Sequence, residues 1–369
     1  MITPQLLAHY QKTRDACHYR LTGHPPMTMV EQLAAISEQA RQYDSQDYYG
    51  QGELIESFET EIATLLGKES AVFLPSGTMA QCIALRVWAD LAGSRSVGFH
   101  ASSHLELHEH NAYETLYGLN SVLLGAPDRV VTLADLESVD SKLAAVLLEL
   151  PMREIGGQLP NWQQLSAQSQ WAREQGIALH MDGARLWQCP AYYGRDMAEI
   201  AALFDSVYVS FYKDIGGIAG SVLAGSADFI ASARIWIRRA GGNLYALYPY
   251  VLSARAGMER NLAAMPECIR SASWLAAYLN QFDGVATLPL QPPTNLFHLQ
   301  VPCDPSRLVE YACDWSERHK VFLLPLPRAH SDGHSIMEFS MGQAVQAQRP
   351  AQWESWLQDF FTHLPRDSN

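Results

Sequence analysis

The segment Gly176-Ile-Ala-Leu-His-Met-Asp-Gly-Ala-Arg185 carries an aspartate at the end of an apolar run, and Asp205-Ser-Val-Tyr-Val-Ser-Phe-Tyr-Lys213 closes a second such run with a lysine. Short apolar runs bounded by glycine or polar residues are typical of buried strands. Parallel sheets gather their ligands at the carboxyl ends of the strands. Asp182 and Lys213 are therefore predicted to lie at the same edge of a buried sheet.

The chemistry of this pair indicates a cofactor. A desolvated lysine can lose its proton and condense with a carbonyl, and a nearby carboxylate can hold a pyridine nitrogen in its protonated form. Lys213 and Asp182 therefore predict a site for pyridoxal 5′-phosphate (PLP). Arg185 presents a planar fork of donors that suits a substrate carboxylate. The alternative is a structural Asp and Arg pair at a strand end.

A turn with two hydroxyls, Ser76-Gly77-Thr78, lies between an expected strand at 71–74 and an expected helix at 79–91. The free N–H groups and the positive dipole end of a helix N-terminus favour phosphate. Ser76, Gly77 and Thr78 are therefore candidates for binding the cofactor phosphate. A plain helix N-cap is the alternative interpretation.

Strands and helices alternate along the first two thirds of the chain. This alternation predicts an α/β fold in which helices cover both faces of a mostly parallel sheet. Beyond residue 255, long helices and short strands indicate a smaller α+β domain. We expect an N-terminal arm at 1–35, a large cofactor-binding domain at 36–254 and a small domain at 255–369. The further strands expected in the large domain lie at 130–132, 144–149, 177–181, 206–211 and 221–224, with helices at 53–66 and 165–174.

Composition excludes several classes of protein. The 369 residues are 48% apolar and 18% charged, with a formal net charge of -13. This acidic balance offers no basic surface for nucleic acid, and no apolar run reaches the length of a membrane span. The six cysteines include no Cys-x-x-Cys pair, which favours neither a disulfide framework nor a zinc ribbon. We expect a cytoplasmic protein without nucleic-acid or membrane partners.

Three histidines recur every four residues at His100, His104 and His108. On one helix they would resemble a metal site. However, Ser103 and Glu106 have the spacing of a capping box, which would start the helix after His100. No metal is therefore expected. His104 is a candidate to stack on the cofactor ring and move protons, and plain packing is the alternative.

These motifs together resemble the low-specificity threonine aldolases of the β-eliminating lyase superfamily, in order from about residue 45 to residue 255. The motifs that carry the resemblance are Tyr48-Tyr49-Gly50, the run from Gly67 to Ala80, Ser103-His104 with Glu109, His180 to Arg185, Asp205 to Lys213, and Gly220 to Gly225.

The resemblance implies an aminotransferase-like large domain of the seven-stranded type. It implies that Lys213 forms the covalent link to PLP, that Asp182 contacts the pyridine nitrogen and that His104 stacks on the ring. It implies phosphate contacts from the Ser76 turn, and a homodimer or homotetramer with sites at the subunit interfaces. Arg238, or alternatively Arg234 or Arg239, would then reach the neighbouring subunit's phosphate.

The chain departs from the family pattern at three places. Met152 stands where the family usually has a histidine that handles the substrate hydroxyl, and it cannot accept a proton. Lys213 lies between Tyr212 and Asp214 instead of between serine and glycine. The family's second carboxylate-binding arginine is missing near residue 337, and Arg328 or Arg153 is the expected substitute.

The leading functional prediction is a lyase that cleaves the Cα–Cβ bond of a β-hydroxy-α-amino acid to glycine and an aldehyde. The alternatives are another PLP reaction, β-elimination or transamination, with Tyr212 as the extra acid or base, and a non-enzymatic binding protein. A nucleotide dehydrogenase is disfavoured because no Gly-x-Gly-x-x-Gly follows the first strand of the large domain.

Overall fold

The computed structural model describes residues 2–329 and 334–365. The chain forms two compact units. The larger combines Met27–Glu154 with Gln158–Ala263, and the smaller combines Met1–Pro26, Ile155–Gly157 and Ala264–Asn369. The first 26 residues thus group with the C-terminal third, where the sequence suggested a separate arm.

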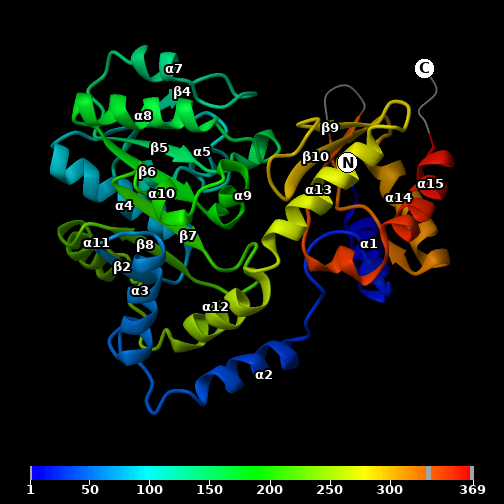
Figure 1. Ribbon diagram of the computed structural model, residues 1–369, viewed down its shortest axis with the longest axis horizontal. Helices are drawn as coiled ribbons and strands as arrows, with labels where there is room; N and C mark the ends of the chain where they lie inside the picture. The colour runs from blue at the N-terminus through cyan, green and yellow to red at the C-terminus, as the bar shows by residue number, and fades with distance from the viewer. Residues whose placement is uncertain (1, 330–333, 366–369) are drawn as a thin grey trace. The chain divides into compact units, whose positions relative to one another are not determined.

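A seven-stranded sheet forms the centre of the larger unit, in the order β2-β8-β7-β6-β5-β3-β4 (Figure 1). Strand β8 runs antiparallel to both of its neighbours, and the remaining pairs are parallel. The predicted α/β class with a mostly parallel sheet is therefore confirmed. The strands are β2 (Ser70–Leu74), β3 (Ser96–His100), β4 (Asn120–Leu124), β5 (Ala145–Glu149), β6 (Ala178–Gly183), β7 (Ser206–Ser210) and β8 (Ser221–Gly225).

Both faces of this sheet are covered, as alternation along β2 shows. Val72 and Leu74 belong to the core cluster with helices α4 (Gly77–Ala92) and α11 (Ala227–Arg239). Phe73 points to the other face and packs on Phe58 of helix α3 (Glu53–Leu65). Successive side chains of a strand point to opposite faces, so a run buried throughout requires helices on both sides.

Other helices of the larger unit connect or flank the strands, and two local predictions about them were wrong. Thr132 caps α7 instead of ending a strand at 130–132. The Ser103 side chain makes no cap hydrogen bond to α5, which is a single turn, so the predicted capping box is absent. The helices are α2 (Met29–Ala40), α5 (His104–Leu107), α6 (Ala112–Thr115), α7 (Leu133–Glu137), α8 (Trp162–Gln175), α9 (Cys189–Tyr193), α10 (Met197–Ala201) and α12 (Tyr248–Asn261).

The smaller unit is built around a four-stranded antiparallel sheet in the order β12-β13-β10-β9. Its core contains Trp315, Trp353 and Phe339, each fully buried. The strands are β9 (Ala286–Leu288), β10 (Leu296–Val301), β12 (Arg328–Ala329) and β13 (Ser335–Ser340), a parallel pair joins β1 (Tyr19–Arg20) to β11 (Val321–Phe322), and the helices are α1 (Pro4–Ala16), α13 (Met265–Leu279), α14 (Pro305–His319) and α15 (Pro350–Thr362).

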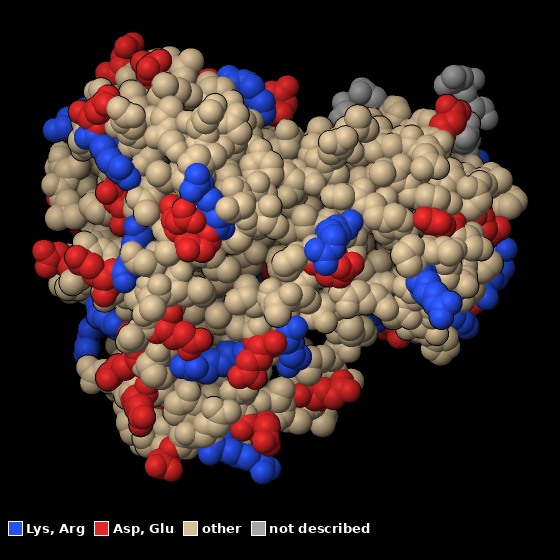
Figure 2. All heavy atoms as spheres, viewed as in Figure 1, with Lys and Arg blue, Asp and Glu red and all other residues tan. Residues whose placement is uncertain are grey.

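Charged side chains of both signs are interspersed on the face seen in Figure 2. Among the described residues, no helix is long and apolar enough to cross a membrane.

We predict that Phe99→Ala will destabilise the larger unit by about 3–5 kcal/mol, because it empties a fully buried position on β3 that packs against Tyr113. Urea denaturation measures the change. The control Leu91→Ala removes a side chain that is 64% exposed and should change stability by less than about 0.5 kcal/mol. Equal effects of the two substitutions would contradict this assignment of the core.

Candidate active site

Three ionisable residues meet at the carboxyl ends of β5, β6 and β7. Glu149 and Asp182 are register partners on neighbouring parallel strands. Lys213 follows β7, which pairs with β6. Asp182 is buried, and Glu149 and Lys213 are partly buried. The parallel topology thus places a lysine and two carboxyl groups at one edge of the sheet.

Burial dominates the electrostatics of this cluster. It lowers the pKa of Lys213, and the charge of Arg185 lowers it further, while Asp182 and Glu149 act in the opposite direction. Burial raises the pKa of Asp182, opposed chiefly by the charge of Lys213. A lysine with a lowered pKa exposes its lone pair more often at neutral pH, as a carbonyl-binding amine requires.

Glu149 is a member of this cluster that the sequence did not single out. Burial, and then the charge of Asp182, raise its pKa to about 7. Its Oε1 accepts the backbone N–H of Arg153 at 3.0 Å. Its position at the end of an apolar run was the available signal, because the same signal identified Asp182 and Lys213.

His104, at the start of α5, is oriented by a carboxylate. Its Nδ1 lies 2.9 Å from Oε1 of Glu109, whose side chain is only 2% exposed. This contact engages one ring nitrogen and leaves Nε2 as the second position for proton exchange. The neighbouring His108 pairs with Glu154 at 2.9 Å. His100 instead contacts Ser102 and the carbonyl of Ala126.

The described residues contain no group of three or more His, Cys, Asp or Glu side chains arranged to hold a metal ion.

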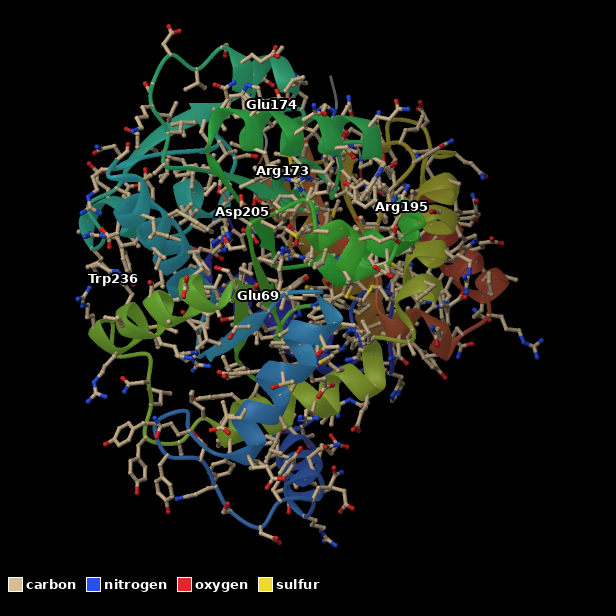
Figure 3. All side chains as sticks on the ribbon, turned by 60° about the vertical axis from the view of Figure 1, so that its left-hand side comes forward. Glu69, Arg173, Glu174, Arg195, Asp205 and Trp236 are labelled. Carbon is tan, nitrogen blue, oxygen red and sulfur yellow. The ribbon has the colours of Figure 1, made fainter. Side chains whose placement is uncertain are left out.

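The predicted phosphate turn forms the N-terminus of α4. Ser76 is the N-cap, and its hydroxyl accepts the N–H of Met79 at 3.3 Å. Ser76 and Thr78 line a pocket of about 470 Å³ together with Trp236 and Arg239 from α11. Trp236 is labelled in Figure 3, where it lies at the outer end of that helix. This pocket opens beside the turn, and Lys213 and Asp182 are not among its described lining residues.

The three arginines of α11 have different surroundings. Arg234 pairs with Glu59, Arg238 lines a separate pocket of about 180 Å³, and Arg239 lines the pocket beside Ser76. Within one chain, Arg239 is thus the arginine that lies beside the turn. The contact predicted for Arg238 involves a neighbouring subunit and stays a prediction.

The candidate substrate-binding arginines are distributed over both units. Arg185 follows β6, and its charge acts on both Lys213 and Glu149. Arg153 contacts Glu154 at 3.0 Å. Arg328 belongs to β12 of the smaller unit, and its side chain lies outside the described part of the structure. Its predicted role stays a prediction.

Two tyrosine hydroxyls lie at the first turn of α4, and sequence reasoning did not find Tyr208. The hydroxyls of Tyr208 and Tyr212 are 3.3 Å apart. Both hydroxyls lie against the backbone of Gly77.

Comparison with known proteins decides the family. The β-eliminating lyase family model matches residues 27–302. The chain belongs to the β-eliminating lyase family. Aldolase vrtJ of Penicillium aethiopicum is 35% identical over 294 residues, which cover 76% of this chain and 73% of that protein. A low-specificity L-threonine aldolase of Escherichia coli K12 is 28% identical over 267 residues, 69% of this chain and 77% of that enzyme.

A solved structure supports the same assignment over nearly the full length. A Listeria monocytogenes EGD-E protein described as an L-allo-threonine aldolase superposes with a TM-score of 0.91 at 41% identity, covering 96% of this chain and 99% of that one. This member of the β-eliminating lyase family is a PLP-dependent lyase with an aspartate aminotransferase-like fold. The predicted family, fold, cofactor and enzyme class are confirmed.

The residues present fit PLP. Lys213 supplies an amine with a lowered pKa, Asp182 a buried carboxylate, and His104 a ring held by Glu109. The N-terminus of α4 supplies hydroxyls and N–H groups for a phosphate. These donors match the aldehyde, the pyridine nitrogen, the ring and the phosphate of the cofactor.

We predict that Glu149→Gln will flatten the pH dependence of stability of the cofactor-free protein. Folding raises the pKa of Glu149 from 4.5 to about 7, so the folded state retains a proton that the unfolded state has released. Wild-type stability should therefore fall as the pH rises from about 4.5 through 7. Removing this group should relieve on the order of 3 kcal/mol of that loss.

Urea midpoints measured from pH 5 to pH 8 test this expectation. Glu174→Gln, an exposed glutamate on α8 labelled in Figure 3, is the matched control and should retain the wild-type slope. A wild-type slope in Glu149→Gln would mean that Glu149 does not titrate in this range.

Proposed function

We propose that the protein cleaves the Cα–Cβ bond of β-hydroxy-α-amino acids, producing glycine and an aldehyde. The observation that carries the proposal is Lys213, partly buried with a lowered pKa, acting beside the buried carboxylate of Asp182. The threonine aldolase relatives and the L-allo-threonine aldolase structure support this choice among PLP reactions.

Each residue of the site has a part in this reaction. When bound, PLP supplies an electron sink for the electron pair left on the substrate α-carbon. Asp182 holds a proton at the ring nitrogen, because a carboxylate in a buried site stabilises an adjacent cation strongly. Arg185 binds the substrate carboxylate with its planar fork of donors. Lys213 provides the amine that the substrate amine displaces.

His104 is the proposed acceptor of the β-hydroxyl proton. Glu109 fixes Nδ1, so Nε2 can take a proton and the carboxylate stabilises the imidazolium that results. Met152, which stands at the position of the family's second histidine, is buried and has no proton-accepting nitrogen or oxygen. The hydroxyl therefore depends on His104 or on a water for deprotonation.

We further propose that the substrate is a small free amino acid, that the enzyme acts in the cytoplasm, and that it assembles as a homodimer or homotetramer. Six free cysteines, five of them buried, support a reducing compartment. The exposed Leu116 beside the pocket at Ser76 supports coverage of that face by a second copy.

We expect the purified enzyme with PLP to convert β-hydroxy amino acids to glycine and an aldehyde. Chromatography of the products on threonine, allo-threonine and phenylserine measures this directly. Lys213→Ala is the control and should lose the visible cofactor band and turnover by several orders of magnitude. The corresponding 2-oxo acid with ammonia and without glycine would establish the β-elimination alternative. Conversion of the amino acid to a 2-oxo acid that keeps the β-hydroxyl, with the amino group passed to an added 2-oxo acid, would establish transamination.

Asp182→Asn should reduce kcat by about 100- to 1000-fold, because a neutral amide cannot stabilise a protonated ring nitrogen. Steady-state aldol cleavage measures the loss, and absorbance titration checks that the variant still binds PLP. Asp196→Asn, which retains an oxygen able to cap α10, is the matched control and should keep wild-type turnover. A wild-type kcat in Asp182→Asn would show that the Asp182 carboxylate does not contribute to the reaction.

A further inference from the structure

The hydroxyls of Tyr208 and Tyr212 occupy the space that a side chain at residue 77 would fill. A Cβ atom built on Gly77 would lie 2.0 Å from the Tyr208 hydroxyl oxygen and 2.7 Å from that of Tyr212. Gly77 has no positive φ angle, so its backbone conformation does not require glycine. Glycine is required because any side chain at this position would collide with the two hydroxyls.

The two tyrosines differ in their freedom to move. Tyr208 lies on β7 and is 2% exposed, whereas Tyr212, beside Lys213, is 38% exposed. The Tyr212 hydroxyl lies beside Gly77, the first residue of α4, whose N–H is one of the helix N–H groups without a partner inside the helix. A partly exposed phenol can turn toward an anion at this helix N-terminus at small cost.

We infer that Tyr208 and Tyr212 are phosphate-positioning residues: Tyr212 donates its hydroxyl to the cofactor phosphate beside the N–H of Gly77, and Tyr208 supports the Tyr212 hydroxyl. An anion at this helix N-terminus is favoured by the helix dipole and by the free N–H groups. The inference rests on PLP as the cofactor and holds whichever reaction the enzyme performs.

The protonation of the two phenols suits this role. Burial raises the pKa of Tyr208 and of Tyr212, and the charge of Asp182 contributes in the same direction. Both hydroxyls therefore keep their protons at neutral pH and remain donors. Hydrogen bonds from neutral donors to an anion are stronger than those between neutral groups.

Binding of PLP and of pyridoxal, which lacks the phosphate, tests the inference. Each ligand is titrated into the cofactor-free full-length protein, and the dissociation constant is read from absorbance and tyrosine fluorescence. Tyr212→Phe should bind PLP about tenfold more weakly, as expected for the loss of one hydrogen bond to a charged group. Its affinity for pyridoxal should stay within about twofold of wild type.

Tyr10→Phe is the matched control, because it removes a buried hydroxyl that donates to the carbonyl of Leu324 in the smaller unit. Its affinities for both ligands should match wild type. Tyr208→Phe should weaken PLP binding in the same direction as Tyr212→Phe. The ³¹P resonance of bound PLP should shift in the Tyr212 variant and stay in place in the Tyr10 variant.

Wild-type affinity of Tyr212→Phe for PLP, or equal losses for PLP and pyridoxal, would overturn the inference. Equal losses would mean that Tyr212 contacts the cofactor ring or stabilises the folded protein, and that it does not bind the phosphate. These results are independent of the reaction products. A failure here leaves the proposed aldol cleavage standing, and the formation of a 2-oxo acid instead of glycine leaves the phosphate contacts standing.

Discussion

Burial of a lysine beside carboxyl groups at one edge of the sheet is the constraint on which the site depends. Desolvation disfavours the charged form of Lys213 and that of Asp182, while the attraction between the two charges favours both. Partial compensation leaves an amine with a lowered pKa. Such a group has no evident structural benefit in a core, but it suits an amine that must form a bond to a carbonyl carbon.

The sheet topology makes this arrangement possible. Strands β5, β6 and β7 are neighbours and run parallel, so their carboxyl ends lie at one edge. Glu149 is the last residue of β5, Asp182 lies on β6 and Lys213 follows β7, so the buried strands hold these groups in place. The turn after β2 adds the helix N-terminus of α4. The same fold therefore supplies both the helix N-terminus that binds the PLP phosphate and the lysine that bonds to the PLP aldehyde.

Much of this was predictable because the reactive residues close short apolar runs. Asp182 and Lys213 were found in this way, and so was the mostly parallel sheet. Strand β4 was missed because it is an edge strand with partly exposed side chains, and β3 has a glycine at its centre. Tyr208 was missed because a tyrosine inside a buried strand looks like ordinary core. The sequence does not show that the Tyr208 hydroxyl lies against Gly77; that contact depends on how the fold packs β7 against the start of α4.

Trapping the cofactor link tests the central claim most directly. Borohydride treatment of the holoenzyme, followed by proteolysis and mass spectrometry of the peptides, identifies the lysine that is bonded to PLP. The account predicts a single reduced pyridoxyl phosphate adduct, on the peptide that contains Lys213. An adduct on Lys68, Lys142 or Lys320 with Lys213 unmodified would contradict it.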